Sequence, residues 1–181
     1  MQQQQGFTLL EVIIVITLLA GLSLLALINI PNQANHIQME SRRLVSVLEF
    51  IIQRSELERH VFGLQLSEHE WKILKLCSSE CSKNKAVQVS SIWSEKYWQE
   101  TFRGKYSLHR VLPENLKIQL HINNESIKIN TNLNDTIEPI IFFYPGGEIT
   151  KFLIKLKNIE DNNSIEIKLN DNNIIFIKEG S

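Results

Sequence analysis

The sequence has no excess of charge of either sign. Its 19 lysine and arginine residues face 20 aspartate and glutamate residues, so the formal net charge of the 181-residue chain is -1. Proteins that bind nucleic acid or an anionic lipid surface through their overall field carry a basic surplus. The composition therefore predicts no nucleic-acid partner.

Cysteine is equally scarce, with only Cys77 and Cys81 in the whole chain. Their C-S-S-E-C spacing is not the C-x-x-C of redox proteins. A structural zinc ion needs about four ligands, and neither His60 nor His69 stands at a spacing that would complete such a set. We expect no metal site and no cofactor.

Sequence motifs for catalysis are also missing: there is no G-x-S-x-G, H-E-x-x-H or P-loop. Acid–base groups do occur, and Glu68, His69 and Glu70 are consecutive. Such a cluster is more often a charged turn between two strands than a catalytic set. We expect no enzymatic activity, and keep a membrane-anchored enzyme as the alternative from another functional class.

What the chain does have is one long apolar run, residues 7–30, in which Glu11 is the only charged residue. About 20 helical residues cross the roughly 30 Å hydrocarbon core of a bilayer. The run therefore predicts a transmembrane helix. A carboxylate within such a helix costs about 2.5–3.5 kcal/mol and marks function by default; the alternative is that Glu11 lies near the interface, where the cost is small.

The leader before this run does not fit a cleaved secretory signal. Residues 1–6 contain no lysine or arginine, and the run ends in Asn29-Ile30-Pro31 rather than in an A-x-A cleavage site. The run is also longer than the apolar region of a signal peptide. A different kind of N-terminal processing is therefore indicated.

The segment G-F-T-L-L-E-V, residues 6–12, resembles the prepilin-type signal of type IV pilins and type II secretion pseudopilins. The resemblance implies that a prepilin peptidase cuts after Gly6 and methylates the new amine of Phe7, and that Glu11 is the assembly carboxylate. In a filament, Glu11 of one subunit would meet the Phe7 amine of its neighbour, because a buried charge becomes tolerable when it is paired. A simple anchor that never polymerises would leave all three residues unexplained.

The helical pattern resumes after Pro31, with apolar residues at three- and four-residue steps up to about Arg59. Because proline lacks an N–H group, it disrupts the helix near that point. We predict one long helix over residues 7–59 with a kink at Pro31, and two separate helices as the alternative. The second half should pack on a β domain.

From His60 onward the pattern has a period of two, which is typical of strands. Asn123-Asn124 and residues 171–173 supply turn residues that tolerate positive φ. The fold class is therefore α+β, a long N-terminal helix packed on a C-terminal β-sandwich. The predicted strands are residues 61–66, 71–76, 86–89, 106–108, 116–122, 126–129, 139–144, 150–156, 164–169 and 174–178.

Two further stretches resemble the H-type pseudopilins (GspH) and the related FimT-type minor pilins. Residues 140–148 with 152–154 are similar to the family's C-terminal hairpin, and residues 57–64 with Trp71 are similar to its junction between helix and first strand. The domains implied are a cleaved leader (1–6), a transmembrane and assembly helix (7–30), the continuation of that helix (31–59) and a periplasmic domain (60–181).

This resemblance implies a pilin-like minor pseudopilin of the type II secretion system, a structural subunit that follows the tip subunits in a periplasmic pseudopilus supporting protein secretion across the outer membrane. The protein would be held by a single-pass helix in the inner membrane. Its partners would be other minor pseudopilins, the major pseudopilin, the prepilin peptidase and the inner-membrane assembly platform. A FimT-type minor pilin of a type IV pilus is the alternative.

Two features of the domain allow more than one interpretation. In the periplasm Cys77 and Cys81 would form a local disulfide, with two free thiols as the alternative. The aromatic cluster of Trp93, Tyr97 and Trp98 either covers the core or, if exposed, is a contact for another subunit, since tryptophan and tyrosine concentrate at interface hot spots.

Overall fold

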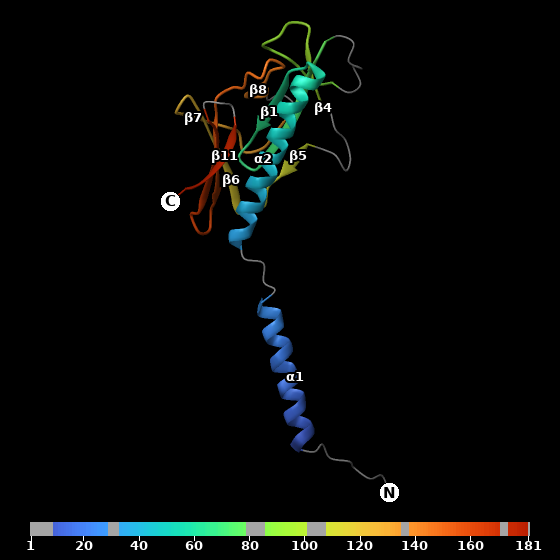
Figure 1. Ribbon diagram of the computed structural model, residues 1–181, viewed down its shortest axis with the longest axis vertical. Helices are drawn as coiled ribbons and strands as arrows, with labels where there is room; N and C mark the ends of the chain where they lie inside the picture. Colours follow the sequence, from blue (N-terminus) through green and yellow to red (C-terminus); the bar gives the residue numbers. More distant parts are fainter. Residues whose placement is uncertain are drawn as a thin grey trace. The chain divides into compact units, whose positions relative to one another are not determined.

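The computed structural model describes residues 9–28, 33–78, 86–100, 108–134, 138–170 and 174–180 (Figure 1). The chain divides into two compact units, Met1–Asn35 and His36–Ser181. The first contains helix α1 (Leu9–Ile28), and helix α2 (Gln33–Glu58) begins at the boundary between the units. The predicted kink at Pro31 lies outside the described residues.

Helix α1 forms because its 20 residues contain no proline and only one glycine, Gly21. The predicted transmembrane segment, residues 7–30, reaches past the described helix at both ends. Among the helices in the described part of the chain, none has the length and apolar character needed to cross a membrane.

Helix α2 is amphipathic, and its buried face belongs to the β domain. Ile37, Leu44, Leu48 and Ile51 are all buried in the main core, at the spacing that places residues on one side of a helix. The helix ends before Arg59, whose φ of 55° is the left-handed conformation that commonly ends a helix. The prediction that this second helical half packs on a β domain is confirmed.

The β domain consists of two antiparallel sheets. The strands of the first sheet are β1 (Phe62–Leu66), β2 (Glu70–Cys77), β3 (Ala86–Val89), β4 (Tyr97–Glu100), β5 (His109–Val111) and β8 (Ile141–Phe143). Those of the second sheet are β6 (Leu116–Ile122), β7 (Glu125–Ile127), β9 (Leu153–Asn158), β10 (Ser164–Leu169) and β11 (Ile175–Gly180). The first sheet has the order β3-β4-β2-β1-β8, with β5 paired to β2, and the second has the order β11-β10-β9-β6-β7.

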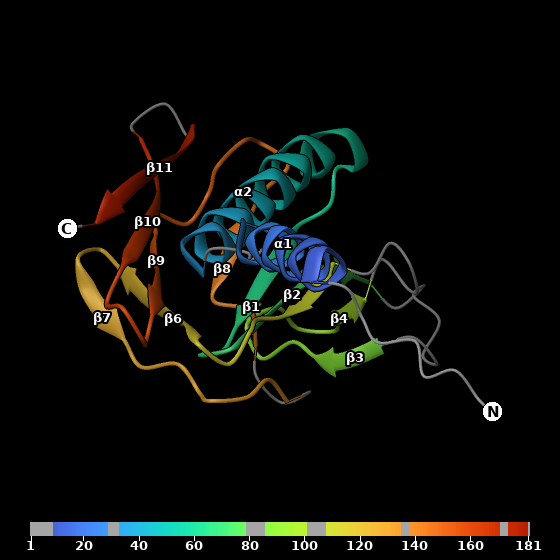
Figure 2. The same ribbon diagram turned by 90° about the horizontal axis from the view of Figure 1, so that it is seen from below.

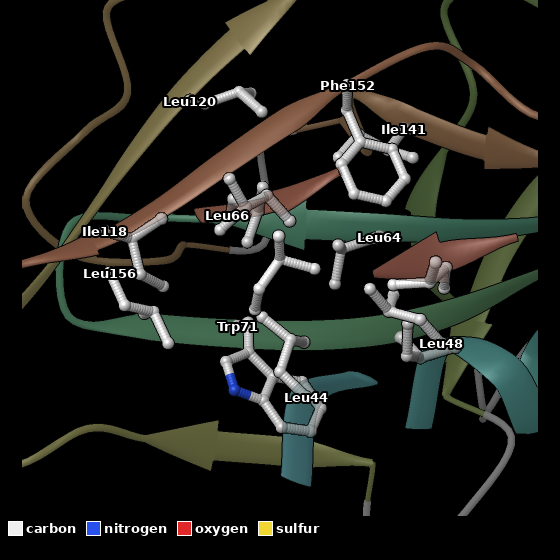
Figure 3. Close-up of a cluster of buried hydrophobic side chains, with 14 of the residues drawn as sticks. Leu44, Leu48, Leu64, Leu66, Trp71, Ile118, Leu120, Ile141, Phe152 and Leu156 are labelled. Carbon is white, nitrogen blue, oxygen red and sulfur yellow. The ribbon is translucent and has the colours of Figure 1, made fainter. Parts of the chain in front are cut away.

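The main core lies where the two sheets and α2 meet, and α2 lies beside both sheets in Figure 2. Leu64, Leu66 and Trp71 come from the first sheet, Ile118, Leu120 and Leu156 from the second, and Leu44 and Leu48 from the helix (Figure 3). Burying each such side chain contributes about 1.5–3 kcal/mol. This shared core holds α2 and the sheets together as one unit.

Most predicted strands are present, and β6 and β10 have the predicted bounds. The turn at Asn123-Asn124 has φ of 51° and 68°, as predicted, whereas residues 171–173 lie outside the described residues. Residues 106 and 107 of the predicted strand 106–108 also lie outside, and β5 begins at His109.

Two local features differ from the predictions. Residues 97–100, for which no strand was predicted, form β4, because this segment pairs with both β2 and β3. The turn at residues 144–147 does close, with Gly147 at φ 79° and a bridge between Phe143 and Ile149. The chain then continues into the second sheet, so the hairpin is limited to this turn and strands β8 and β9 do not pair with each other.

Candidate functional site

The predicted N-terminal site is described in part. Gly6 and Phe7 lie outside the described residues, whereas Glu11 lies in the first turn of α1. A carboxylate is stabilised at that position because the N-terminal end of a helix carries a partial positive charge. The structure therefore places the predicted assembly carboxylate where a helix favours it.

Around Glu11, α1 presents an apolar surface. Every described side chain from residue 9 to residue 22 is exposed, and Leu9 is 80% exposed. The hydroxyl of Thr17 donates within the helix, 3.0 Å from the carbonyl oxygen of Ile13 and 2.9 Å from that of Ile14. An exposed apolar surface of this extent is typical of a segment that is covered by a membrane or by another protein.

A buried ion pair fixes the start of α2 to the first sheet. Glu40 is 1% exposed, and the Arg110 guanidinium on β5 donates to both of its carboxylate oxygens, at 3.1 Å from Nε and 2.5 Å from Nη2. The hydrogen bonds to Glu40 raise the pKa of Arg110. Two parallel hydrogen bonds set an orientation as well as a distance, so this pair positions α2 on the domain.

A second polar contact fixes the end of α2. Glu58 accepts a hydrogen bond from Lys75 Nζ on β2 at 2.9 Å and another from Arg54 one helical turn earlier. Burial acts to raise the pKa of Glu58, but the hydrogen bonds and charges of Lys75 and Arg54 outweigh it and leave the pKa below its ordinary value. The helix is thus attached to the first sheet near both of its ends.

The aromatic cluster packs on the face of the first sheet that points away from the main core. Trp98 is fully buried with Leu74 and Leu76, and the Trp93 and Phe142 rings lie 5.8 Å and 6.0 Å from its own ring. Trp98 is therefore a core residue, which corrects the alternative that it is an exposed subunit contact. Trp93 and Tyr97 are half-buried.

The Glu138 carboxylate holds Ser90 and Ser91 next to Trp98, at the small core that Trp98 forms with its neighbours. The carboxylate accepts hydrogen bonds from the Trp98 indole at 3.0 Å and from the Ser90 hydroxyl at 2.5 Å. The backbone N–H of Ser91 lies 3.1 Å from one carboxylate oxygen and 3.2 Å from the other. Glu138 was not predicted from the sequence, because it lies 40 positions from Trp98 and belongs to no periodic pattern.

Cys77 ends β2 and is disulfide-bonded. The only other cysteine of the chain, Cys81, lies outside the described residues. The predicted bridge between the two therefore stays a prediction. Cys77 is paired in register with Tyr97, so its disulfide lies beside β4.

Comparison with protein families identifies the N-terminal segment. Residues 1–27 match the family described as "Prokaryotic N-terminal methylation motif". This match covers Gly6, Phe7 and Glu11, the three residues of the prepilin-type signal.

Curated relatives match the chain over most of its length. The type II secretion system protein H of Pectobacterium carotovorum subsp. carotovorum is 28% identical over 159 residues, which cover 87% of this chain and 83% of that protein. The protein of the same name from Klebsiella michiganensis is 23% identical over 174 residues, which cover 96% of this chain and 94% of that protein.

Solved structures show the same fold. The minor pseudopilin EpsH of Vibrio cholerae superposes with a TM-score of 0.61 at 14% identity, over 81% of this chain and 96% of that one. The solution structure of E. coli GspH gives a TM-score of 0.53 at 18% identity, over 84% of this chain and 93% of that one. The chain thus carries a prepilin-type methylation motif and resembles the H-type minor pseudopilins of type II secretion systems in sequence and in fold.

Proposed function

We propose that this protein is an H-type minor pseudopilin, a structural subunit of the type II secretion pseudopilus and not an enzyme. One observation carries the proposal: a methylation motif on residues 1–27 is joined to a domain with the fold of the minor pseudopilin EpsH. The motif alone would fit any pilin-like protein. The relatives named protein H, which match over nearly the whole chain, support the assignment to secretion.

The proposed maturation begins with cleavage after Gly6. A prepilin peptidase removes residues 1–6 and methylates the amine of Phe7, four residues before Glu11. In the assembled pseudopilus the carboxylate of Glu11 pairs with the Phe7 amine of a neighbouring subunit. Opposite charges attract strongly in an apolar environment, and the pairing offsets the cost of burying each charge.

The proposed location is the inner membrane, with residues 60–181 in the periplasm. The apolar run of residues 7–30 and the exposed apolar side chains of α1 support this. Before assembly the bilayer would cover α1, and in the pseudopilus other subunits would. The proposed partners are the other minor pseudopilins, the major pseudopilin, the prepilin peptidase and the assembly platform.

Mass spectrometry of the N-terminal peptide tests the proposal. In cells with an active prepilin peptidase, the chain extracted from membranes should begin at N-methylated Phe7. Cells that lack the peptidase are the control, and there the chain should still begin at Met1. A chain that begins at Met1 in both strains would contradict the proposal and favour an anchored domain that does not polymerise.

A second measurement separates secretion from pilus biogenesis. Deletion of the gene should remove folded proteins from the culture medium and leave surface pili unchanged. Loss of pili with normal secretion would instead assign the protein to a type IV pilus, as a FimT-type minor pilin.

A further inference from the structure

The second sheet has one face in the core and one face turned outward. The register of its strands determines which side chains lie on each face. On β6, Leu116, Ile118 and Leu120 are buried, so the residues between them point outward. Directly paired residues of antiparallel strands lie on the same face. The pairs therefore extend the outward face across β9, β10 and β11.

Three rows of side chains make up this outward face. Each row is given in the strand order β6, β9, β10, β11. They are His121, Leu153, Lys168 and Phe176; Gln119, Lys155, Glu166 and Lys178; and, on β6 and β9 alone, Lys117 and Lys157, because the next residue in that row, Ser164 of β10, is buried. We call these residues the basic face. It holds five lysines and one carboxylate, in a chain whose overall net charge is -1.

Two of the five lysines have carboxylate partners. Lys117 Nζ lies 3.0 Å from Glu68, and Lys155 Nζ lies 3.7 Å from Glu166. Among the described residues, no carboxylate is within ion-pair distance of Lys157, Lys168 or Lys178. The basic face therefore keeps a net positive charge that a partner can neutralise.

A cleft of about 440 Å³ lies at one end of this face. Its charged lining residues, Lys151 and Lys168, are both basic, and Asn123 and Asn124 add side-chain amides. Phe152, Leu153 and Leu169 provide apolar walls. The cleft can thus accept a carboxylate and bury part of an apolar side chain next to it.

From this arrangement we infer that the basic face binds an extended, acidic segment of another protein, with one acidic side chain in the cleft. In an extended strand, alternate side chains lie on the same side about 6.6 Å apart. Lys155 and Lys157 have the same two-residue repeat on β9, so the carboxylates of such a segment can face successive lysines.

The apolar residues of the basic face favour a protein segment over a lipid surface. Lys168 lies between Leu153 and Phe176 in its row, and its ammonium group lies 5.3 Å from the centre of the Phe176 ring. A segment that alternates acidic and apolar residues matches both kinds of group. Complementary charge chiefly increases the association rate and the specificity of such binding.

Fluorescence anisotropy with the full chain in a neutral detergent tests the inference. The probe is a fluorescein-labelled peptide that alternates glutamate and valine, and the control peptide has glutamine in place of glutamate. We expect the acidic peptide to bind, the control peptide not to bind, and the affinity to fall as salt is added.

Single variants locate the site. Lys157→Gln and Lys168→Gln should each weaken peptide binding by about fivefold to tenfold, the effect expected for one close charge pair. Lys96→Gln is the matched control, because Lys96 is an exposed lysine that precedes β4 of the first sheet. Unchanged tryptophan fluorescence in each variant would show that the fold is intact.

Several outcomes would overturn the inference: no binding of the acidic peptide, equal weakening by all three variants, or tighter binding to vesicles that contain phosphatidylglycerol or to a DNA duplex than to the peptide. Because the test involves no assembly step, its failure would leave the proposed function unaffected. Failure of N-terminal processing would likewise leave the peptide test unaffected.

Discussion

The Glu40 carboxylate on α2 and the Arg110 guanidinium on β5 form a bidentate pair across 70 positions of sequence. Glu40 is almost inaccessible to solvent, whereas Arg110 keeps about a third of its side chain exposed. Removing the arginine would leave a buried carboxylate without its partner, which is much more costly than losing a surface ion pair. The pair is therefore the polar contact on which the position of α2 depends most.

We predict that Arg110→Met lowers the free energy of unfolding by about 3 kcal/mol, because it leaves the buried charge of Glu40 without its partner Arg110. The double variant Glu40→Leu/Arg110→Met should recover most of that loss, since neither charge remains. Chemical denaturation followed by circular dichroism measures both values. Equal stability of the single and the double variant would show that the pair is not coupled.

Gly63 lies where any larger residue would collide. A Cβ at this position would be 2.5 Å from Cβ of Pro139 and 3.0 Å from Cη2 of Trp98. We predict that Gly63→Ala destabilises the domain by about 1–3 kcal/mol through overpacking. Gly146→Ala is the matched control, because a Cβ there meets no atom within 4 Å; a similar loss in both variants would contradict the steric explanation.

Periodicity in the sequence predicted those elements whose apolar residues repeat regularly. Leu116, Ile118 and Leu120 alternate with polar residues, so β6 was predicted with its observed bounds. Strand β4 was missed because Y-W-Q-E contains a single buried residue, Trp98, and becomes a strand only through pairing with its neighbours.

Contacts between distant positions could not be predicted in the same way. The contacts of Glu40 with Arg110 and of Glu138 with Trp98 produce no local pattern in the sequence. Each pair joins residues that are far apart in the chain and come together only in the folded domain. The basic face could not be predicted from the overall charge either, because the chain is nearly neutral. Its lysines lie on one side of the sheet only because of the strand register.

The contact between Glu138 and Trp98 predicts a response to acid. Burial acts to raise the pKa of Glu138, but hydrogen bonds from Ser90, Ser91 and Trp98 outweigh it and leave the pKa below the ordinary value of 4.5. Because the folded state prefers the ionised form, this stabilisation is complete above about pH 4.5 and is lost as the pH falls through the lower folded pKa.

Tryptophan fluorescence between pH 6 and pH 2 should therefore show a transition below pH 4.5, as the indole loses an ionised acceptor. Glu138→Gln should remove that transition and lower stability at neutral pH. Glu148→Gln is the control, because Glu148 is an exposed residue of the turn after β8. A transition that persists unchanged in Glu138→Gln would assign it to another group.

The predicted disulfide between Cys77 and Cys81 closes a very short loop. In the chain-entropy description, a loop of about five residues contributes about 2 kcal/mol to stability. We expect the double variant Cys77→Ser/Cys81→Ser to lose about that much and the reduced wild-type chain to lose the same amount. Mass spectrometry of the unreduced peptide checks the bridge directly, and two alkylatable thiols in the native protein would disprove it.

Glu11 provides the most direct test of assembly. We predict that Glu11→Ala still enters the membrane fraction and is still processed at Phe7, because the apolar run is unchanged. Incorporation into pseudopili should fall by at least about tenfold, the change that a loss of about 1.4 kcal/mol produces.

Glu11→Gln should behave like Glu11→Ala if the charge matters, and like the wild type if a hydrogen bond suffices. Glu49→Ala, which removes an exposed carboxylate from α2, is the control and should assemble normally. Co-purification with sheared pseudopili measures all four proteins, and normal incorporation of Glu11→Ala would refute the pairing of Glu11 with the neighbouring Phe7 amine.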